Sequence, residues 1–176
     1  MISSTSPWIS VALLALTLPA AITDARSGLI PNWLTLPALA AVPLARGIVQ
    51  GPGALGLSVL GACVCGLVPL LLFGLRAIGG GDVKLLAAIG ALTGVRLGLE
   101  VELEGLMLCM LYGLGLLAFR GELLATLRRS LALLVAPLVP KARRKVPTAA
   151  AMTSVRLGPA IFLAAATCVA RGVLGV

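Results

Sequence analysis

Runs of apolar residues long enough to cross a lipid bilayer dominate the chain. A spanning helix needs about 20 mostly apolar residues, with a usable range of about 17–25. Six segments reach or approach this length: residues 7–23, 33–49, 53–75, 83–99, 101–119 and 157–176. The pattern predicts an all-α integral membrane protein with about six transmembrane helices, forming a single domain over residues 1–176.

An acidic cluster interrupts the boundary between the fourth and fifth of these segments. Glu100, Glu102 and Glu104 follow closely on Arg96. We expect this cluster to form a tight turn at one membrane surface. The three glutamates, together with Glu122, are interpreted as solvated surface charges.

One long connection, residues 121–147, separates the fifth segment from the last. Its leucines recur at helical spacing opposite Arg128 and Arg129, which predicts an amphipathic helix lying on the membrane surface. The basic residues of this connection are expected to face anionic lipid headgroups, each contributing about 1 kcal/mol. They are Arg128, Arg129, Lys141, Arg143, Arg144 and Lys145. An alternative that does not exclude the first is that these basic residues serve only to set the orientation of the chain in the membrane.

The composition agrees with a lipid environment. Apolar residues make up 60% of the chain and charged residues 11%, against about 25% charged in soluble domains; the mean hydropathy is +1.12. The net charge of +8 does not indicate nucleic-acid binding, because the basic residues lie between apolar runs and only six aromatic residues are present. With no histidine and with cysteines only inside apolar stretches, we expect no metal and no cofactor.

The basic residues predict an orientation. With six spans, one set of connections holds eleven lysines and arginines and the opposite set only Arg46, Arg96 and Arg171. The richer set is expected in the cytoplasm, with both termini outside. The first segment resembles a secretory signal, but no basic residue precedes Arg26, so we expect it to be retained as a helix.

Two of the six acidic residues, Asp24 and Asp82, lie at the edges of apolar segments on the predicted cytoplasmic side. An acid placed there is costly and is by default a candidate functional site. Pro31 and Asn32 follow Asp24 and are expected to restart a helix, with Asn32 as its N-cap.

Three consecutive glycines, Gly79, Gly80 and Gly81, precede Asp82. They allow a sharp bend and a close approach to another part of the chain, while Asp82 can cap the following helix. Taken singly, capping by Asp82 and pairing of Asp24 with Arg26 are sufficient explanations. Taken together, two acids beside two helix breaks on one membrane face favour a functional pair.

Two carboxyl groups held close together tend to share one proton. The neutral member can donate a hydrogen bond to a scissile carbonyl while the ionised member takes a proton from water. This is general acid–base hydrolysis of a peptide bond without a metal or a covalent intermediate.

The motifs resemble those of type IV prepilin peptidases, membrane aspartic proteases of the GxGD class. The matching elements are the stretch from Asp24 through Pro31, Asn32 and Thr35; the run from Gly79 to Lys84; and the late Gly158-Pro159-Ala160. The resemblance implies that Asp24 and Asp82 are the catalytic carboxylates. Lys84, Pro31, Asn32, Gly158 and Pro159 are implied to support the site, and a purely structural role for them is equally compatible.

The resemblance also implies a substrate and a location. Such enzymes remove the basic leader from prepilins or pseudopilins at the cytoplasmic face of the bacterial inner membrane. No cysteine pairs precede Pro7, so the chain is similar to the short form associated with Flp-type, tight-adherence pili, and no methyltransferase activity is expected. The chain departs from a frequent aromatic version of the late motif by carrying Arg156-Leu157 before Gly158.

Two other classes of function remain as alternatives. A small transporter could use Asp24 and Asp82 to relay protons or bind a cation, but it predicts acids near the bilayer midplane and inverted repeats. A catalytically inert assembly subunit would use the glycines for helix packing. The oligomeric state is not predicted by any of these patterns.

Overall fold

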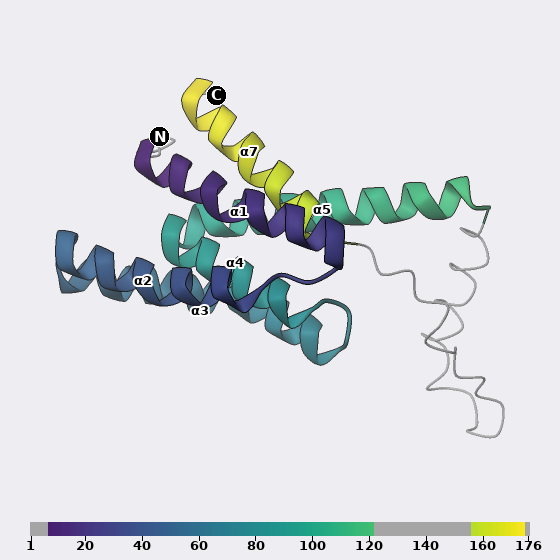
Figure 1. Cartoon of the computed structure of the whole chain (residues 1–176). Helices are drawn as coiled ribbons and strands as arrows, with labels where there is room; N and C mark the ends of the chain where they lie inside the picture. The colour runs from purple at the N-terminus through teal and green to yellow at the C-terminus, as the bar shows by residue number, and fades with distance from the viewer. Residues whose placement is uncertain (1–6, 122–155, 175–176) are drawn as a thin grey trace, which may run out of the picture. The chain divides into compact units, whose positions relative to one another are not determined.

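The computed structural model describes residues 7–121 and 156–174, and all of the regular structure within these ranges is helical. The chain divides into two compact units, Met1–Leu108 with Arg156–Val176, and Cys109–Val155. Within these ranges the helices are α1 (Pro7–Ser27), α2 (Asn32–Gln50), α3 (Pro52–Gly74), α4 (Gly80–Thr93), α5 (Val95–Phe119) and α7 (Gly158–Leu174). The predicted all-α architecture is confirmed, and Figure 1 shows these helices.

Glycine and proline determine where the first helices end and begin. Gly28, with φ of +69°, ends α1, and Pro31 in an extended conformation precedes the first residue of α2. Gly51, with φ of +91°, separates α2 from α3, which opens on Pro52. Left-handed φ values suit glycine, while proline suits a helix start because its missing N–H would have no partner there.

Four of the described helices, α1, α2, α3 and α5, are long and apolar enough to cross a membrane. The helix α4 has only 14 residues and α7 has 17, so the expected number of six spans stays a prediction. Large apolar side chains remain exposed on α2 and α3, as expected of helices that face lipid. The predicted amphipathic segment 121–147 lies outside the described residues, apart from Gly121.

The break between the fourth and fifth segments was predicted at the wrong place. It lies at Gly94, with φ of +82°, and α5 runs without interruption through the expected acidic turn. Glutamate is a good helix former, and Glu100 pairs with Arg96 one turn earlier at 3.3 Å. The acidic residues therefore have no reason to end the helix, whereas a glycine in a left-handed conformation does.

The interpretation of the glutamates as solvated surface charges is also wrong for one of them. Glu102 is 2% exposed, and its Oε2 has no hydrogen-bond partner among the described residues. Glu100 is exposed, as expected, while Glu104 is half-buried and pairs with Arg171 of α7. Hydropathy along the sequence does not distinguish these three positions, because which of them is buried depends on the neighbouring helices.

In the first unit, α3 packs against α4 and α1 packs against α7, while α2 contacts both α3 and α4. Glycines make the α3–α4 contact close. A Cβ added to Gly90 would lie 2.3 Å from the carbonyl oxygen of Gly61 and 2.6 Å from Cβ of Cys65. Small residues allow helix backbones to approach in this way inside membranes, where dispersion contacts replace the hydrophobic effect between helices.

Candidate active site

Three junctions of the chain meet at one end of the first unit: the end of α1, the start of α4 and the start of α7 (Figure 1). Asp24 lies in the last turn of α1 and Asp82 in the first turn of α4. Gly158 opens α7 and contacts Asp24, while Gly81 of α4 approaches the loop that follows α1. Both predicted acids therefore lie at the same end of this unit.

Asp24 is a buried carboxylate with a well-defined partner. Its side chain is 6% exposed, and the backbone N–H of Gly158 donates a hydrogen bond of 2.9 Å to its Oδ2. A Cβ added to Gly158 would lie 2.8 Å from Cβ of Asp24. Only glycine at position 158 allows this approach without displacing the carboxylate.

Asp82 is the third residue of α4, and its Oδ2 accepts a hydrogen bond of 3.0 Å from the backbone N–H of Gly79. The expected capping role of Asp82 is confirmed, since this bond satisfies a donor at the helix start. Asp82 lies in a helix outside the four candidate spans. Burial raises the pKa of its carboxyl to about 6; the Gly79 hydrogen bond opposes this shift, and the charge of Asp24 adds to it.

The influence of Asp24 on the pKa of Asp82 means that the two carboxyl groups interact electrostatically. The negative charge of Asp24 disfavours ionisation of Asp82, in the same direction as the larger effect of burial. Such an arrangement can supply a proton donor and a proton acceptor to the same small volume.

Asn32 does not cap α2 as expected. Pro31 occupies the N-cap position, and no side chain caps this helix start. Asn32 is instead the first helical residue, and its Oδ1 accepts a hydrogen bond of 2.8 Å from Nζ of Lys84. This contact joins the start of α2 to α4 immediately beyond Asp82.

Of the three glycines before Asp82, Gly81 makes the closest approach to another segment. A Cβ there would lie 2.9 Å from Cβ of Ile30, in the loop between α1 and α2. A Cβ on Gly80 would meet only the ring of Phe73, at 3.4 Å, and one on Gly79 would meet Oδ2 of Asp82 at 3.2 Å. The predicted close approach is thus confirmed, with Gly81 as the residue that requires it.

Arg156 contacts the site although it was not predicted as a site residue. Nη1 of Arg156 donates hydrogen bonds to the carbonyl oxygens of Asp24, at 2.9 Å, and of Ala25. The available signal was a basic residue two positions before the late motif. Pro159, the second residue of α7, has a favourable place at a helix start, where its missing N–H needs no partner.

The described part of the chain contains no group of three histidine, cysteine or acidic side chains that could hold a metal ion.

Comparison with known proteins assigns the chain to a family. The model of the type IV leader peptidase family matches residues 11–119, a stretch that includes both Asp24 and Asp82 and ends before Gly158. No match was found among curated proteins or among solved structures. The resemblance seen in the motifs is confirmed, and residues 7–121 contain four helices able to span a bilayer. The chain belongs to the type IV leader peptidase family of membrane proteins.

Proposed function

We propose that the protein is an aspartic endopeptidase that removes the basic leader from type IV prepilins or pseudopilins, with Asp24 and Asp82 as its catalytic residues. The observation that carries the proposal is the meeting of a buried acid in the last turn of α1 and a half-buried acid in the first turn of α4 at one end of the first unit. An acid at the edge of an apolar helix is costly and is by default a candidate functional residue, and here two of them lie at the same end of one unit.

The surroundings of the two acids support different roles. Asp82, with its raised pKa, is the member that holds the shared proton and donates it as a hydrogen bond to the scissile carbonyl oxygen. Asp24, whose Oδ2 is held by the Gly158 amide, takes a proton from water. The water oxygen attacks the carbonyl carbon, and the peptide C–N bond then breaks.

Proton balance closes the cycle. The departing amine receives a proton from the pair and becomes the new amino terminus of the pilin, while the leader leaves with a new carboxyl group. One water molecule is consumed for each bond cleaved. No metal, cofactor or covalent intermediate is needed for this sequence of steps.

The finer assignments belong to the same proposal. The substrate is of the Flp type, cleavage occurs at the cytoplasmic face of a bacterial inner membrane, and both termini lie outside. The six basic residues proposed to contact anionic lipid, from Arg128 to Lys145, lie outside the described residues.

The test is co-expression of the full chain with a candidate Flp-type prepilin, with loss of the leader followed on a gel. Asp24→Asn and Asp82→Asn should each abolish processing while the protein is still inserted in the membrane. Glu100→Gln is the matched control, because Glu100 is an exposed acid that pairs only with Arg96 in the described structure. Normal processing by both aspartate variants would refute the proposed mechanism.

A further inference from the structure

The carbonyl oxygens at the end of α1 accept hydrogen bonds from a side chain that is distant in the sequence. A helix leaves its final four carbonyl oxygens without intrahelical donors, and in α1 these belong to residues 24–27. The backbone N–H of Gly28 donates to the Asp24 oxygen at 2.8 Å. Nη1 of Arg156 donates to the same oxygen, at 2.9 Å, and also to the oxygen of Ala25.

Arg156 comes from a distant part of the sequence, 132 residues beyond Asp24. Arginine suits this position because its charge interacts favourably with the negative end of the helix dipole while its planar group donates hydrogen bonds. The contact therefore fixes the segment before α7 to the end of α1 at the turn that carries the proposed catalytic acid.

Gly158 follows Arg156 by two residues, and its amide donates to the Asp24 side chain. Arg156 thus holds the backbone of this turn while Gly158 holds the carboxylate. Loss of the Arg156 contact would remove one of the two ties between the start of α7 and the last turn of α1, and the Gly158 amide could then shift relative to Oδ2 of Asp24.

We propose that Arg156 is a positioning residue of the peptidase, which acts through Gly158 to hold Asp24 in its reactive orientation. The inference rests on the proposed function, because it assumes that Asp24 takes part in hydrolysis. It assigns a role to a residue outside the segment matched by the family model.

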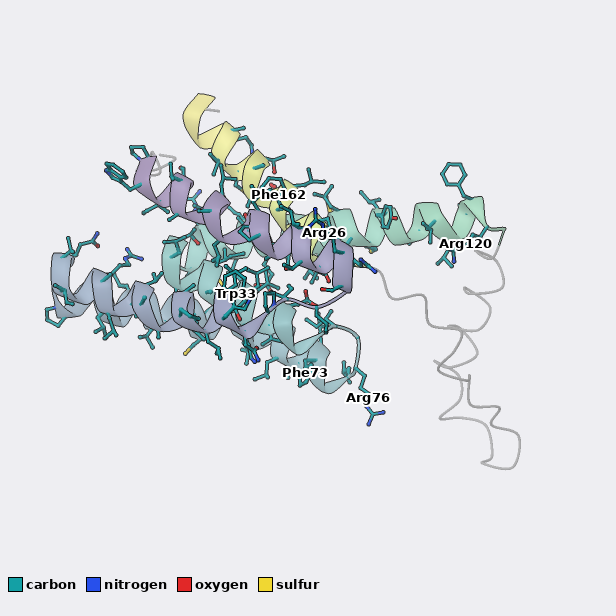
Figure 2. The ribbon with its side chains drawn as sticks, viewed as in Figure 1. Arg26, Trp33, Phe73, Arg76, Arg120 and Phe162 are labelled. Atoms are coloured by element: carbon teal, nitrogen blue, oxygen red, sulfur yellow. The ribbon has the colours of Figure 1, made fainter. Side chains whose placement is uncertain are left out.

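The test measures kcat and KM of the full chain in detergent micelles, with a synthetic prepilin segment that contains the basic leader and the apolar stem. Arg156→Gln should lower kcat by about 10–100-fold, the range expected when a reacting group is displaced by about 1 Å, and should leave KM within about twofold. Arg156→Lys should recover part of the loss. Arg76→Gln is the control, since Arg76 is exposed and projects from the loop after α3 (Figure 2).

A double-mutant cycle separates positioning from a general loss of structure. If Arg156 acts through Gly158, the kcat of the combined Arg156→Gln and Gly158→Ala variant should fall no further than that of the more damaged single variant. The inference would be overturned if the fold-losses in kcat of the two single variants multiplied in the double variant. It would also be overturned if Arg156→Gln left kcat unchanged or changed only KM. If Arg156→Gln does not fold, as judged by thermal unfolding, the cycle is run with Arg156→Lys and judged by the same criteria.

The aspartate variants distinguish failure of this inference from failure of the proposed function. Activity retained in Asp24→Asn would overturn both, because Asp24 would then have no reaction for Arg156 to support. Activity lost in Asp24→Asn but unchanged in Arg156→Gln would overturn only the role of Arg156.

Discussion

Gly81 of α4 and Ile30 of the loop after α1 approach so closely that a Cβ on Gly81 would lie 2.9 Å from Cβ of Ile30 and 3.3 Å from its carbonyl oxygen. Ile30 is itself buried. This contact holds the loop that follows α1 against the helix start that carries Asp82. The contact explains why position 81 requires glycine: a larger residue would push the loop after Asp24 away from the helix that carries Asp82.

Gly81→Ala should therefore separate the two helix ends and lower leader processing by about tenfold or more, because small displacements of reacting groups are costly. Gly80→Ala provides the comparison, since its added Cβ would make only an ordinary contact with the Phe73 ring. Processing rates of the two variants, at equal amounts of inserted protein, test the prediction. Equal losses of processing in Gly81→Ala and Gly80→Ala would mean that the Gly81–Ile30 contact does not determine the activity.

The activity should fall as pH rises through the pKa of Asp82, about 6. In the proposed mechanism the active form has a proton on Asp82 and none on Asp24, and loss of the Asp82 proton removes the donor to the scissile carbonyl. Above this pKa the rate should decrease about tenfold per pH unit. A pH profile of kcat/KM measures it, and a flat profile between about pH 5 and pH 8 would contradict the assignment.

Gly79→Ala should move that descending limb to higher pH. The Gly79 amide holds the pKa of Asp82 down, and an added Cβ 3.2 Å from Oδ2 would weaken the hydrogen bond between them. A weaker bond to the charged form raises the pKa further. A limb displaced to lower pH in this variant would contradict the role of the Gly79 hydrogen bond.

Gly90→Ala should destabilise the α3–α4 contact, because the new Cβ would meet the Gly61 backbone, which cannot move aside like a flexible side chain. Overpacking of this kind costs about 1–3 kcal/mol. Thermal unfolding in detergent, followed by tryptophan fluorescence, should show a lower Tm. Gly56→Ala is the matched control on α3, where a Cβ meets nothing within 4 Å and better helix propensity should keep or raise Tm.

Glu102→Met should stabilise the protein. The buried Oε2 of Glu102 has no partner in the described structure, and an unsatisfied buried polar group costs about 1–3 kcal/mol. Unfolding should occur at higher temperature, with leader processing within about twofold of the parent. Loss of processing in both Glu102→Met and Glu102→Gln would instead indicate a third acid in the reaction.

The sequence was sufficient for those features that depend on neighbouring residues. Apolar length predicts helices that suit lipid, and a helix begins at Pro31 and Asn32, as predicted. Asp24 and Asp82 stand out because a charge beside an apolar run is expensive wherever the helices pack. The motif around them was enough to predict the family, which the comparison confirmed.

The tertiary structure decided what depends on residues far apart in the chain. Hydropathy could not show that Glu102 is buried while Glu100 is exposed, because burial depends on which helix covers each face of α5. Likewise, the hydrogen bonds from Gly158 and Arg156 to the last turn of α1 join segments more than a hundred residues apart. Such contacts form only when packing brings two backbones together, and that proximity is a property of the folded helices and not of either segment alone.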